Sequence, residues 1–164
     1  MAFGFNIDLN VLNHLGLSLY SSTPAVLTEI VSNAWDADAT EVHINVDISK
    51  NEITIKDNGH GMDADDIRGK FLNIGYARRA DNRSKTPLYN RDVMGRKGIG
   101  KLAMFGLANK VSIYTKKQDE NIIGLKVDVQ KLQQAIENHD GEGYQTEDID
   151  DLSAFDLPQG TMIV

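Results

Sequence analysis

The sequence predicts an α/β two-layer sandwich made by a single domain over residues 1–164, with helices packed on a sheet. Three observations predict it. Several short segments alternate apolar with polar residues, as strands with one buried face do. Other segments repeat their apolar residues at helical spacing, and the two kinds of segment alternate along the chain. The 164 residues, 41% hydrophobic and 25% charged, suffice to bury one substantial core.

The first elements are helical. A short helix is expected over 8–15, within an N-terminal arm over 1–22. Thr23 followed by Pro24 is an N-cap and first-turn pair, which predicts a helix that runs to about Asp36. Leu27, Val31 and Ala34 are expected to form its apolar face towards the sheet.

A β-hairpin with one buried face is predicted next, because residues 41–48 and 52–56 both alternate apolar with polar side chains. Asp63 is a good N-cap for a helix through Phe71. The following stretch, 73–98, is basic, aperiodic and longer than an ordinary connection, as functional lids and disordered loops are. The remaining expected elements are a compact helix over 101–108, strands over 110–116 and 122–129, a helix over 131–137 and a last strand over 161–164.

Charge is unevenly distributed along the chain. The formal net charge is −7, yet residues 137–164 hold eight acidic residues and no Lys or Arg. Residues 68–101 hold ten Lys or Arg against two Asp, a local charge of +8. This basic, glycine-containing segment is where a phosphate-bearing ligand is expected, whereas the acidic tail is expected to be a solvated loop.

Composition also excludes several classes of protein. Without cysteine there are no disulfides, thiolate metal sites or cysteine nucleophiles, and the four histidines are scattered. No stretch approaches the roughly 20 apolar residues of a membrane helix, and the N-terminus lacks the basic start of a signal peptide. We therefore expect a cytoplasmic protein with no membrane contact. Because the sequence ends inside an apolar strand pattern, we expect a domain of a longer protein.

A polar stripe marks the second predicted helix. Glu29, Asn33 and Asp36 fall within about 60° of one another at 100° per residue. Such a stripe is compatible with a solvated surface, but its neighbours Ser32 and Ala37 are small instead of the usual Lys and Glu. Small neighbours permit the close approach of a ligand.

The segment IKDNGHGM combines a strand end with two glycines. Asp57 at the strand end is suited to accept a hydrogen bond from a ligand amino group, while Gly59 and Gly61 let the backbone approach and Met62 packs on an apolar ring. A tight turn in which the glycines only supply positive φ explains the pattern equally well.

A third motif, GRKGIGKLAMFGLA, starts at Gly95. Three glycines in six residues lead into a predicted helix start with Lys and Arg beside it, which favours anion capture over a flexible basic linker. It is not a magnesium-binding P-loop, because Leu102 replaces the required Ser or Thr and no buried strand precedes it. The dinucleotide G-x-G-x-x-A pattern fails for the same missing strand.

Together, in this order and spacing, the three motifs resemble the ATP-binding motifs of the GHKL superfamily, the Bergerat-fold group of gyrase B, heat-shock chaperone ATPases, histidine kinases and MutL. The resemblance covers nearly the whole chain. It implies a mixed, largely antiparallel sheet covered on one face by helices, with 73–98 as the ATP lid. The pattern Glu-x-x-x-Asn-Ala-x-Asp-Ala looks most like the chaperone, MutL and microrchidia branches, although Lys101 departs from several of them.

The resemblance also implies roles for individual residues. Glu29 would orient and deprotonate the attacking water, Asn33 would coordinate the Mg²⁺ that bridges the phosphates, and Asp36 would support the site. Asp57 would bind the adenine amino group with help from Thr161. The adenine pocket would be formed by Gly59, Gly61 and Met62, and the remaining nucleotide contacts would come from Gly75, Gly95, Gly98, Ile99, Gly100 and Lys101.

The function implied is ATP binding and slow Mg²⁺-dependent hydrolysis, with lid closure and nucleotide-dependent homodimerisation in a larger protein whose client is DNA or another protein. A histidine-kinase-type phosphotransferase is an alternative, but only about 20 residues precede the helix, too few for a phosphoacceptor domain. A nucleic-acid interaction module is a second alternative, disfavoured because few aromatic residues accompany the basic segment.

Overall fold

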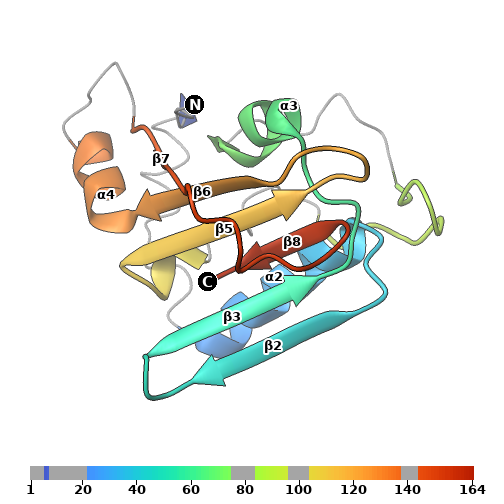
Figure 1. Cartoon of the computed structure of the whole chain (residues 1–164), viewed down its shortest axis with the longest axis horizontal. Coiled ribbons are helices and arrows are strands. Elements are labelled where there is room, and N and C mark those ends of the chain that lie inside the picture. The colour runs from blue at the N-terminus through green and yellow to red at the C-terminus, as the bar shows by residue number, and fades with distance from the viewer. Residues whose placement is uncertain (1–5, 8–21, 75–83, 96–103, 138–143) are drawn as a thin grey trace.

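The computed structural model describes residues 6–7, 22–74, 84–95, 104–137 and 144–164. Its main sheet has the strand order β2–β3–β8–β5–β6–β7, and every neighbouring pair is antiparallel. The strands are β2 (Val42–Asp47), β3 (Glu52–Asp57), β5 (Lys110–Lys116), β6 (Ile123–Asp128), β7 (Glu147–Asp148) and β8 (Gly160–Ile163). A separate parallel pair joins β1 (Asn6–Ile7) to β4 (Asn73–Ile74). The predicted α/β sandwich with a largely antiparallel sheet is confirmed (Figure 1).

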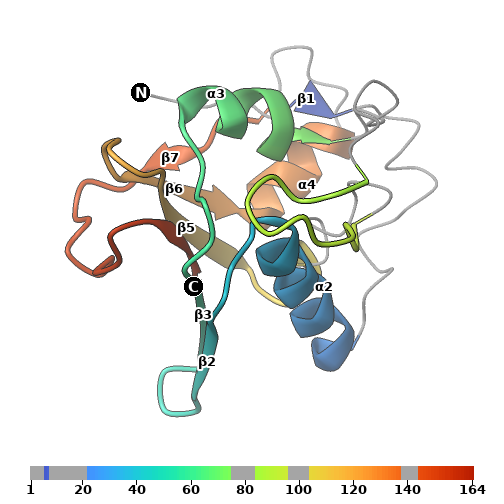
Figure 2. The same cartoon turned by 90° about the vertical axis from the view of Figure 1, so that its right-hand side faces the viewer.

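Helix α2 (Thr23–Asp36) lies against one face of the sheet, and α4 (Val129–Glu137) lies on the same side (Figure 2). The N-cap of α2 is Ser22, one residue before the predicted Thr23, and its side chain makes no capping hydrogen bond. Pro24 therefore stands in the first turn, where its missing N–H costs nothing. The predicted end at Asp36 is confirmed.

Asp63 begins a helical segment as predicted. It forms a capping box with Asp66, whose N–H donates to the Asp63 carboxylate at 2.8 Å. The helix α3 (Ala64–Asp66) continues into a π-turn, η1 (Ile67–Phe71), so the segment ends at the predicted residue. Lys117 from the β5–β6 turn donates to both carboxylates, at 2.7 and 3.1 Å, and holds this segment against the end of the sheet.

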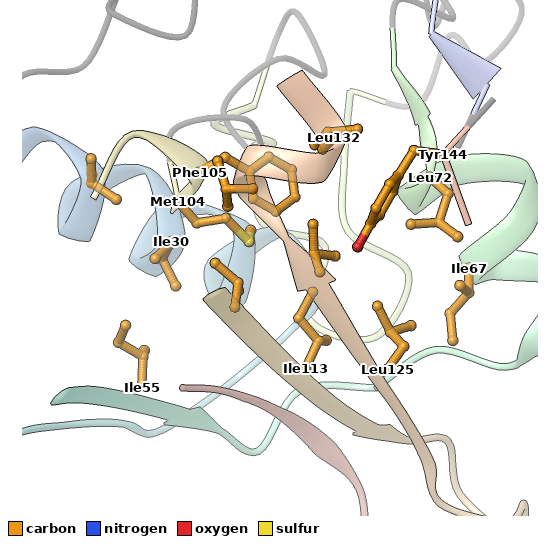
Figure 3. Close-up of a cluster of buried hydrophobic side chains, with 14 residues drawn as sticks. Ile30, Ile55, Ile67, Leu72, Met104, Phe105, Ile113, Leu125, Leu132 and Tyr144 are labelled. Atoms are coloured by element: carbon orange, nitrogen blue, oxygen red, sulfur yellow. The ribbon is translucent and has the colours of Figure 1, made fainter. Parts of the chain in front are cut away.

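The core lies between the helices and the sheet (Figure 3). Ile30 of α2 and the side chains of Met104 and Phe105 pack above Ile113 of β5 and Leu125 of β6. All five are at most 5% exposed. Each buried aliphatic or aromatic side chain of this size contributes about 1.5–3 kcal/mol, so this contact is what fixes α2 on the sheet.

Three predictions about elements need correction or fall outside the description. The predicted hairpin forms, but Ile44 and Val46 of β2 are 43% and 59% exposed, because β2 is the edge strand and is less covered than its neighbour. Within the helix predicted over 101–108, residues 104–106 form a 3-10 turn, and 101–103 lie outside the described residues. The helix predicted over 8–15 also lies outside them.

The acidic tail crosses the opposite face of the sheet, in front of β5 and β6 in Figure 1. Its described carboxylates are exposed as expected, yet Phe155 is only 5% exposed and the Ile149 N–H donates to the Gly124 carbonyl at 3.1 Å. A Cβ on Gly124 would meet Leu152 at 2.6 Å, so glycine there permits the loop to pack closely. The described acidic side chains of this loop are thus solvated as expected, whereas Phe155 packs into the fold.

Candidate functional site

The polar stripe of α2 borders the buried face of that helix. The residues buried against the sheet are Val26, Ile30 and Ala34, whereas Val31, expected on the apolar face, is 39% exposed. Asn33 follows Val26 by two helical turns and therefore lies on the same side. Because Glu29 is half-buried and Asn33 is exposed, the stripe runs along the rim of the interface between helix and sheet. Within the described residues, neither of these two side chains has a hydrogen-bond partner.

Asp57 ends β3 as a buried carboxylate that is 9% exposed. One carboxylate oxygen, Oδ1, accepts the Gly59 N–H at 2.8 Å, and the register places Thr161 of β8 directly opposite. Burial raises the pKa of Asp57 to about 6, although hydrogen bonds from the Gly59 and Thr161 amides and the nearby His60 oppose the shift. A carboxylate can accept about four hydrogen bonds, so Asp57 retains capacity to accept one from a ligand in addition to those from the two amides.

The glycines of the loop are required by close backbone contacts. Gly61 has φ +66, and a Cβ there would collide with the Lys116 carbonyl at the end of β5. A Cβ on Gly59 would approach Ala37 O to 2.8 Å, just beyond the C-terminus of α2. The His60 N–H also donates to Ala37 O at 2.8 Å. The loop is thus held between α2 and β5, which brings the two predicted groups of site residues to the same end of the sheet.

Thr115 joins this loop to β8, and the sequence motifs did not single it out. It is fully buried, and its Oγ1 accepts the Met62 N–H at 2.9 Å. The same hydroxyl lies 3.1 Å from the Gly160 carbonyl, to which it donates, and 3.2 Å from the Thr161 hydroxyl. The available signal was a threonine in an inward-facing position of an otherwise apolar alternation, Val111, Ile113, Thr115.

Asn58 has a structural role between the predicted ligand residues. Its amide oxygen accepts the N–H groups of Thr40 and Glu41 at 2.8 and 2.9 Å, and its amide nitrogen donates to the Thr40 hydroxyl. The side chain is therefore committed to the connection between α2 and β2. It fixes the loop, and its amide group is already paired within the protein.

Asp36 accepts hydrogen bonds from two consecutive backbone amides. Oδ1 accepts from Met94 at 2.7 Å and Oδ2 from Gly95 at 2.8 Å. The structure therefore brings the start of the glycine-rich motif to the helix that carries Glu29 and Asn33. Five further predicted site residues lie outside the described residues: Gly75, Gly98, Ile99, Gly100 and Lys101.

The donor set fits a cation that is shared with a ligand. No group of three or more His, Asp or Glu side chains that could hold a metal occurs in the described part of the chain. Asn33 and Glu29 offer oxygen donors one helical turn apart. Mg²⁺ typically uses one or two protein oxygens together with phosphates and water, so these residues fit Mg²⁺ that is bound with a nucleotide. The same described ranges contain no helix long and apolar enough to cross a membrane.

Comparison with known proteins gives one family and several relatives. Residues 20–157 match the family described as "Histidine kinase-, DNA gyrase B-, and HSP90-like ATPase". The chain is 50% identical over 115 residues to the Herpetosiphon aurantiacus protein named "Putative type II restriction enzyme HgiDII", covering 70% of this chain and 18% of that protein. It is 32% identical over 127 residues to "Chaperone protein HtpG" of Rhodococcus jostii, with 63% of this chain and 20% of the relative covered.

The HtpG of Mycolicibacterium vanbaalenii is 27% identical over 169 aligned residues, which cover 89% of this chain and 24% of the relative. The chain thus spans between about a fifth and a quarter of the length of these relatives.

Proposed function

The chain belongs to the family of histidine kinase-, DNA gyrase B- and HSP90-like ATPases, an ATP-binding family, and on that premise we propose that it binds and slowly hydrolyses ATP with Mg²⁺. The observation that carries the proposal is the buried carboxylate of Asp57. An acceptor that lies at a strand end between Gly59 and Thr161 is suited to one exocyclic amino group, which adenine supplies.

In this proposal one group of the other residues binds adenine and a second group binds the phosphates. Thr161 assists Asp57, and Gly59, Gly61 and Met62 form the adenine pocket, because the loop is held by backbone contacts that a side chain would disrupt. Gly95 and the downstream glycine-rich residues Gly98, Ile99, Gly100 and Lys101 bind the phosphates, with Gly75 contributing from the lid over 73–98.

Glu29 and Asn33 act at the phosphate end. Asn33 holds Mg²⁺ through its side-chain oxygen, and Glu29, one turn earlier on the same helix, accepts a proton from the attacking water. The cation supplies charge neutralisation on the phosphate oxygens. Phosphoryl transfer depends mainly on positioning and charge neutralisation, so a helix that is fixed by its buried face is a suitable platform for both residues.

Glu29→Gln tests hydrolysis separately from binding. We expect ATP turnover to fall by about 10²–10⁴-fold, because a general base is lost, while ATP affinity by calorimetry stays near the wild-type value. Glu120→Gln, on the exposed β5–β6 turn, is the matched control and should hydrolyse normally. Wild-type turnover by the Glu29→Gln variant would remove Glu29 from the role of base. Labelled phosphate found on a histidine instead of in solution would favour the phosphotransferase alternative.

We further propose that nucleotide binding closes the lid and pairs two subunits of a larger protein, and that its client is DNA. The relative with 50% identity is named as a restriction enzyme, whereas the chaperones share 27–32% identity, which favours DNA over an unfolded protein client. Duplex DNA should therefore stimulate ATP turnover by the full-length protein more than a denatured protein does. Stimulation by the denatured protein alone would favour the chaperone reading.

A further inference from the structure

Residues 84–95 pack along the C-terminal end of α2, as the yellow-green segment in Figure 2 shows. The sequence of this stretch is aperiodic, but the segment is ordered by its own contacts. Lys85 and Asp92 form an isolated antiparallel bridge, and the Thr86 N–H donates to the Arg91 carbonyl at 2.8 Å. The segment ends at Gly95, the first residue of the glycine-rich motif.

Asp36, the last residue of α2, holds the end of this segment. Its two carboxylate oxygens accept one hydrogen bond each, from Met94 and Gly95 at 2.7 and 2.8 Å. A Cβ on Gly95 would lie 2.8 Å from Asp36 Oδ2, so a side chain at this position would displace the carboxylate from its present place. Asp36 and Gly95 are therefore matched to each other by shape as well as by hydrogen bonding.

Asp38 holds the middle of the segment. This residue is 5% exposed and has φ +60, and its carboxylate accepts the Leu88 and Tyr89 N–H groups at 2.7 and 3.2 Å. Burial raises the pKa of Asp38, but hydrogen bonds from the Thr86 hydroxyl and these two amides outweigh it, together with the charge of Arg91. The pKa therefore lies below its usual range.

Arg91 and Trp35 add a third set of contacts. The Arg91 guanidinium lies between two rings, 4.5 Å from the centroid of Trp35 and 4.7 Å from that of Tyr89. Its Nη1 donates to the Ala39 carbonyl at 2.6 Å, and the Trp35 indole N–H donates to the Asp92 carbonyl at 2.9 Å. Contacts from the end of α2 thus reach the segment at several independent points.

We propose that Asp36 and Asp38 are positioning residues whose carboxylates fix the start of the glycine-rich motif relative to the helix that carries Glu29 and Asn33. The inference rests on the proposed function, because the distance between these two parts matters only if one nucleotide contacts both. A carboxylate is needed at 36, since an amide side chain offers one acceptor and turns its N–H₂ towards the second backbone donor. The geometry assigns both residues to the phosphate end of the site and neither to adenine.

Asp36→Asn is the main test, with Asp92→Asn as the matched control in the same segment, where the exposed carboxylate pairs with Lys85. By calorimetry with Mg²⁺ we expect Asp36→Asn to bind ATP about tenfold more weakly, and adenosine as the wild type does, because misplacement of the motif affects only the phosphates. Hydrogen exchange without nucleotide should show faster exchange at the Met94 and Gly95 amides in Asp36→Asn and not in the control.

Gly95→Ala perturbs the same contact, through residue 95 instead of through Asp36. If the two residues act through one contact, the double variant Asp36→Asn/Gly95→Ala should bind ATP about as weakly as either single variant, and not with the product of the two losses. If Asp36→Asn folds poorly, the ATP and adenosine affinities of Gly95→Ala alone still test the inference.

The outcomes separate the two proposals. Unchanged ATP affinity together with unchanged amide exchange in Asp36→Asn would overturn the positioning role, as would an equal loss for ATP and adenosine. A wild-type protein that binds no adenine nucleotide would instead overturn the proposed function, and the exchange measurement would then decide the anchoring of residues 94–95 alone.

Discussion

In the proposed function, ligand binding and stability make opposite demands on Asp57. Its carboxylate must be charged to accept strongly from an adenine amino group, yet burial opposes that charge and raises its pKa from 3.8 to about 6. A shift of this size means that the ionised carboxylate lowers the free energy of unfolding above pH 6 by about 3 kcal/mol relative to the protonated form. A buried charge that lowers the stability of the fold is typical of a functional position.

Asp57→Asn should therefore remove a pH-dependent loss of stability while weakening the binding of ADP. The folded state holds the Asp57 proton more tightly than the unfolded chain does, so wild-type stability falls as pH rises from about 4 to 6. The stability difference between variant and wild type should thus shift by up to about 3 kcal/mol in favour of the variant between pH 4 and pH values above 6.

Urea unfolding at several pH values measures this difference, and calorimetry should show ADP affinity reduced by about 10–100-fold at pH 7.5. Asp150→Asn, an exposed residue of the acidic loop, controls for the change of net charge. A stability difference that is independent of pH would contradict the assignment of the raised pKa to burial of Asp57.

At the level of elements, the site depends on three strands meeting one loop. β3 delivers Asp57, β8 delivers Thr161, and β5 delivers Thr115, whose hydroxyl ties the loop at Met62 to the Gly160 carbonyl. Gly160, the first residue of β8, has φ +131, and a Cβ there would collide with the Asp57 carbonyl. Glycine at this position therefore permits β3 and β8 to approach each other closely. The hydroxyl of Thr115 is thus a structural link within the part of the site that is proposed to bind adenine.

Thr115→Val keeps the shape of the side chain and removes this link. The half-buried Met62 N–H would lose its acceptor, so we expect a loss of about 1–3 kcal/mol in the free energy of unfolding and weaker adenosine binding. Thr115→Ser retains the hydroxyl and should keep most of the adenosine affinity, as measured by calorimetry. Equal adenosine affinity in the Val and Ser variants would show that the hydroxyl does not position the loop.

For the molecule as a whole, both faces of the sheet are covered, by different means. Helices α2 and α4 cover one face, and the acidic loop between β7 and β8 crosses the other (Figures 1 and 2). Phe155 of this loop is buried, and Lys56 on β3 forms a 2.6 Å ion pair with Asp156, the next residue of the loop. The loop is therefore part of the folded domain, and its acidic side chains form the outer surface of that layer.

Phe155→Ala should consequently destabilise the whole domain by about 3–5 kcal/mol, the cost of a cavity left by a buried aromatic side chain. Because the loop packs over β8, the strand that carries Thr161, we expect the loop and the sheet to unfold together in a single transition. Asp156→Ala, its neighbour with an exposed carboxylate, should leave the denaturation midpoint nearly unchanged. A separate early transition in Phe155→Ala would show instead that the loop unfolds independently of the sheet.

Local sequence patterns were sufficient to predict several of the elements and the order of the motifs. Alternation predicted the β2–β3 hairpin, Pro24 and Asp63 located the starts of two helical segments, and the motif residues indicated an ATPase of the GHKL type. These features are readable because they depend on periods of two or 3.6 residues and on local capping.

Tertiary structure alone decided what lies between these motifs. Thr115 bonds a residue 53 positions away, Asp38 one 50 positions away and Asp36 one 59 positions away. The burial of Phe155 and the exposure of Val31 likewise depend on which face another segment covers. Such contacts produce no periodic pattern in the sequence, because they join segments that are distant along the chain and are brought together by the strand order of the sheet.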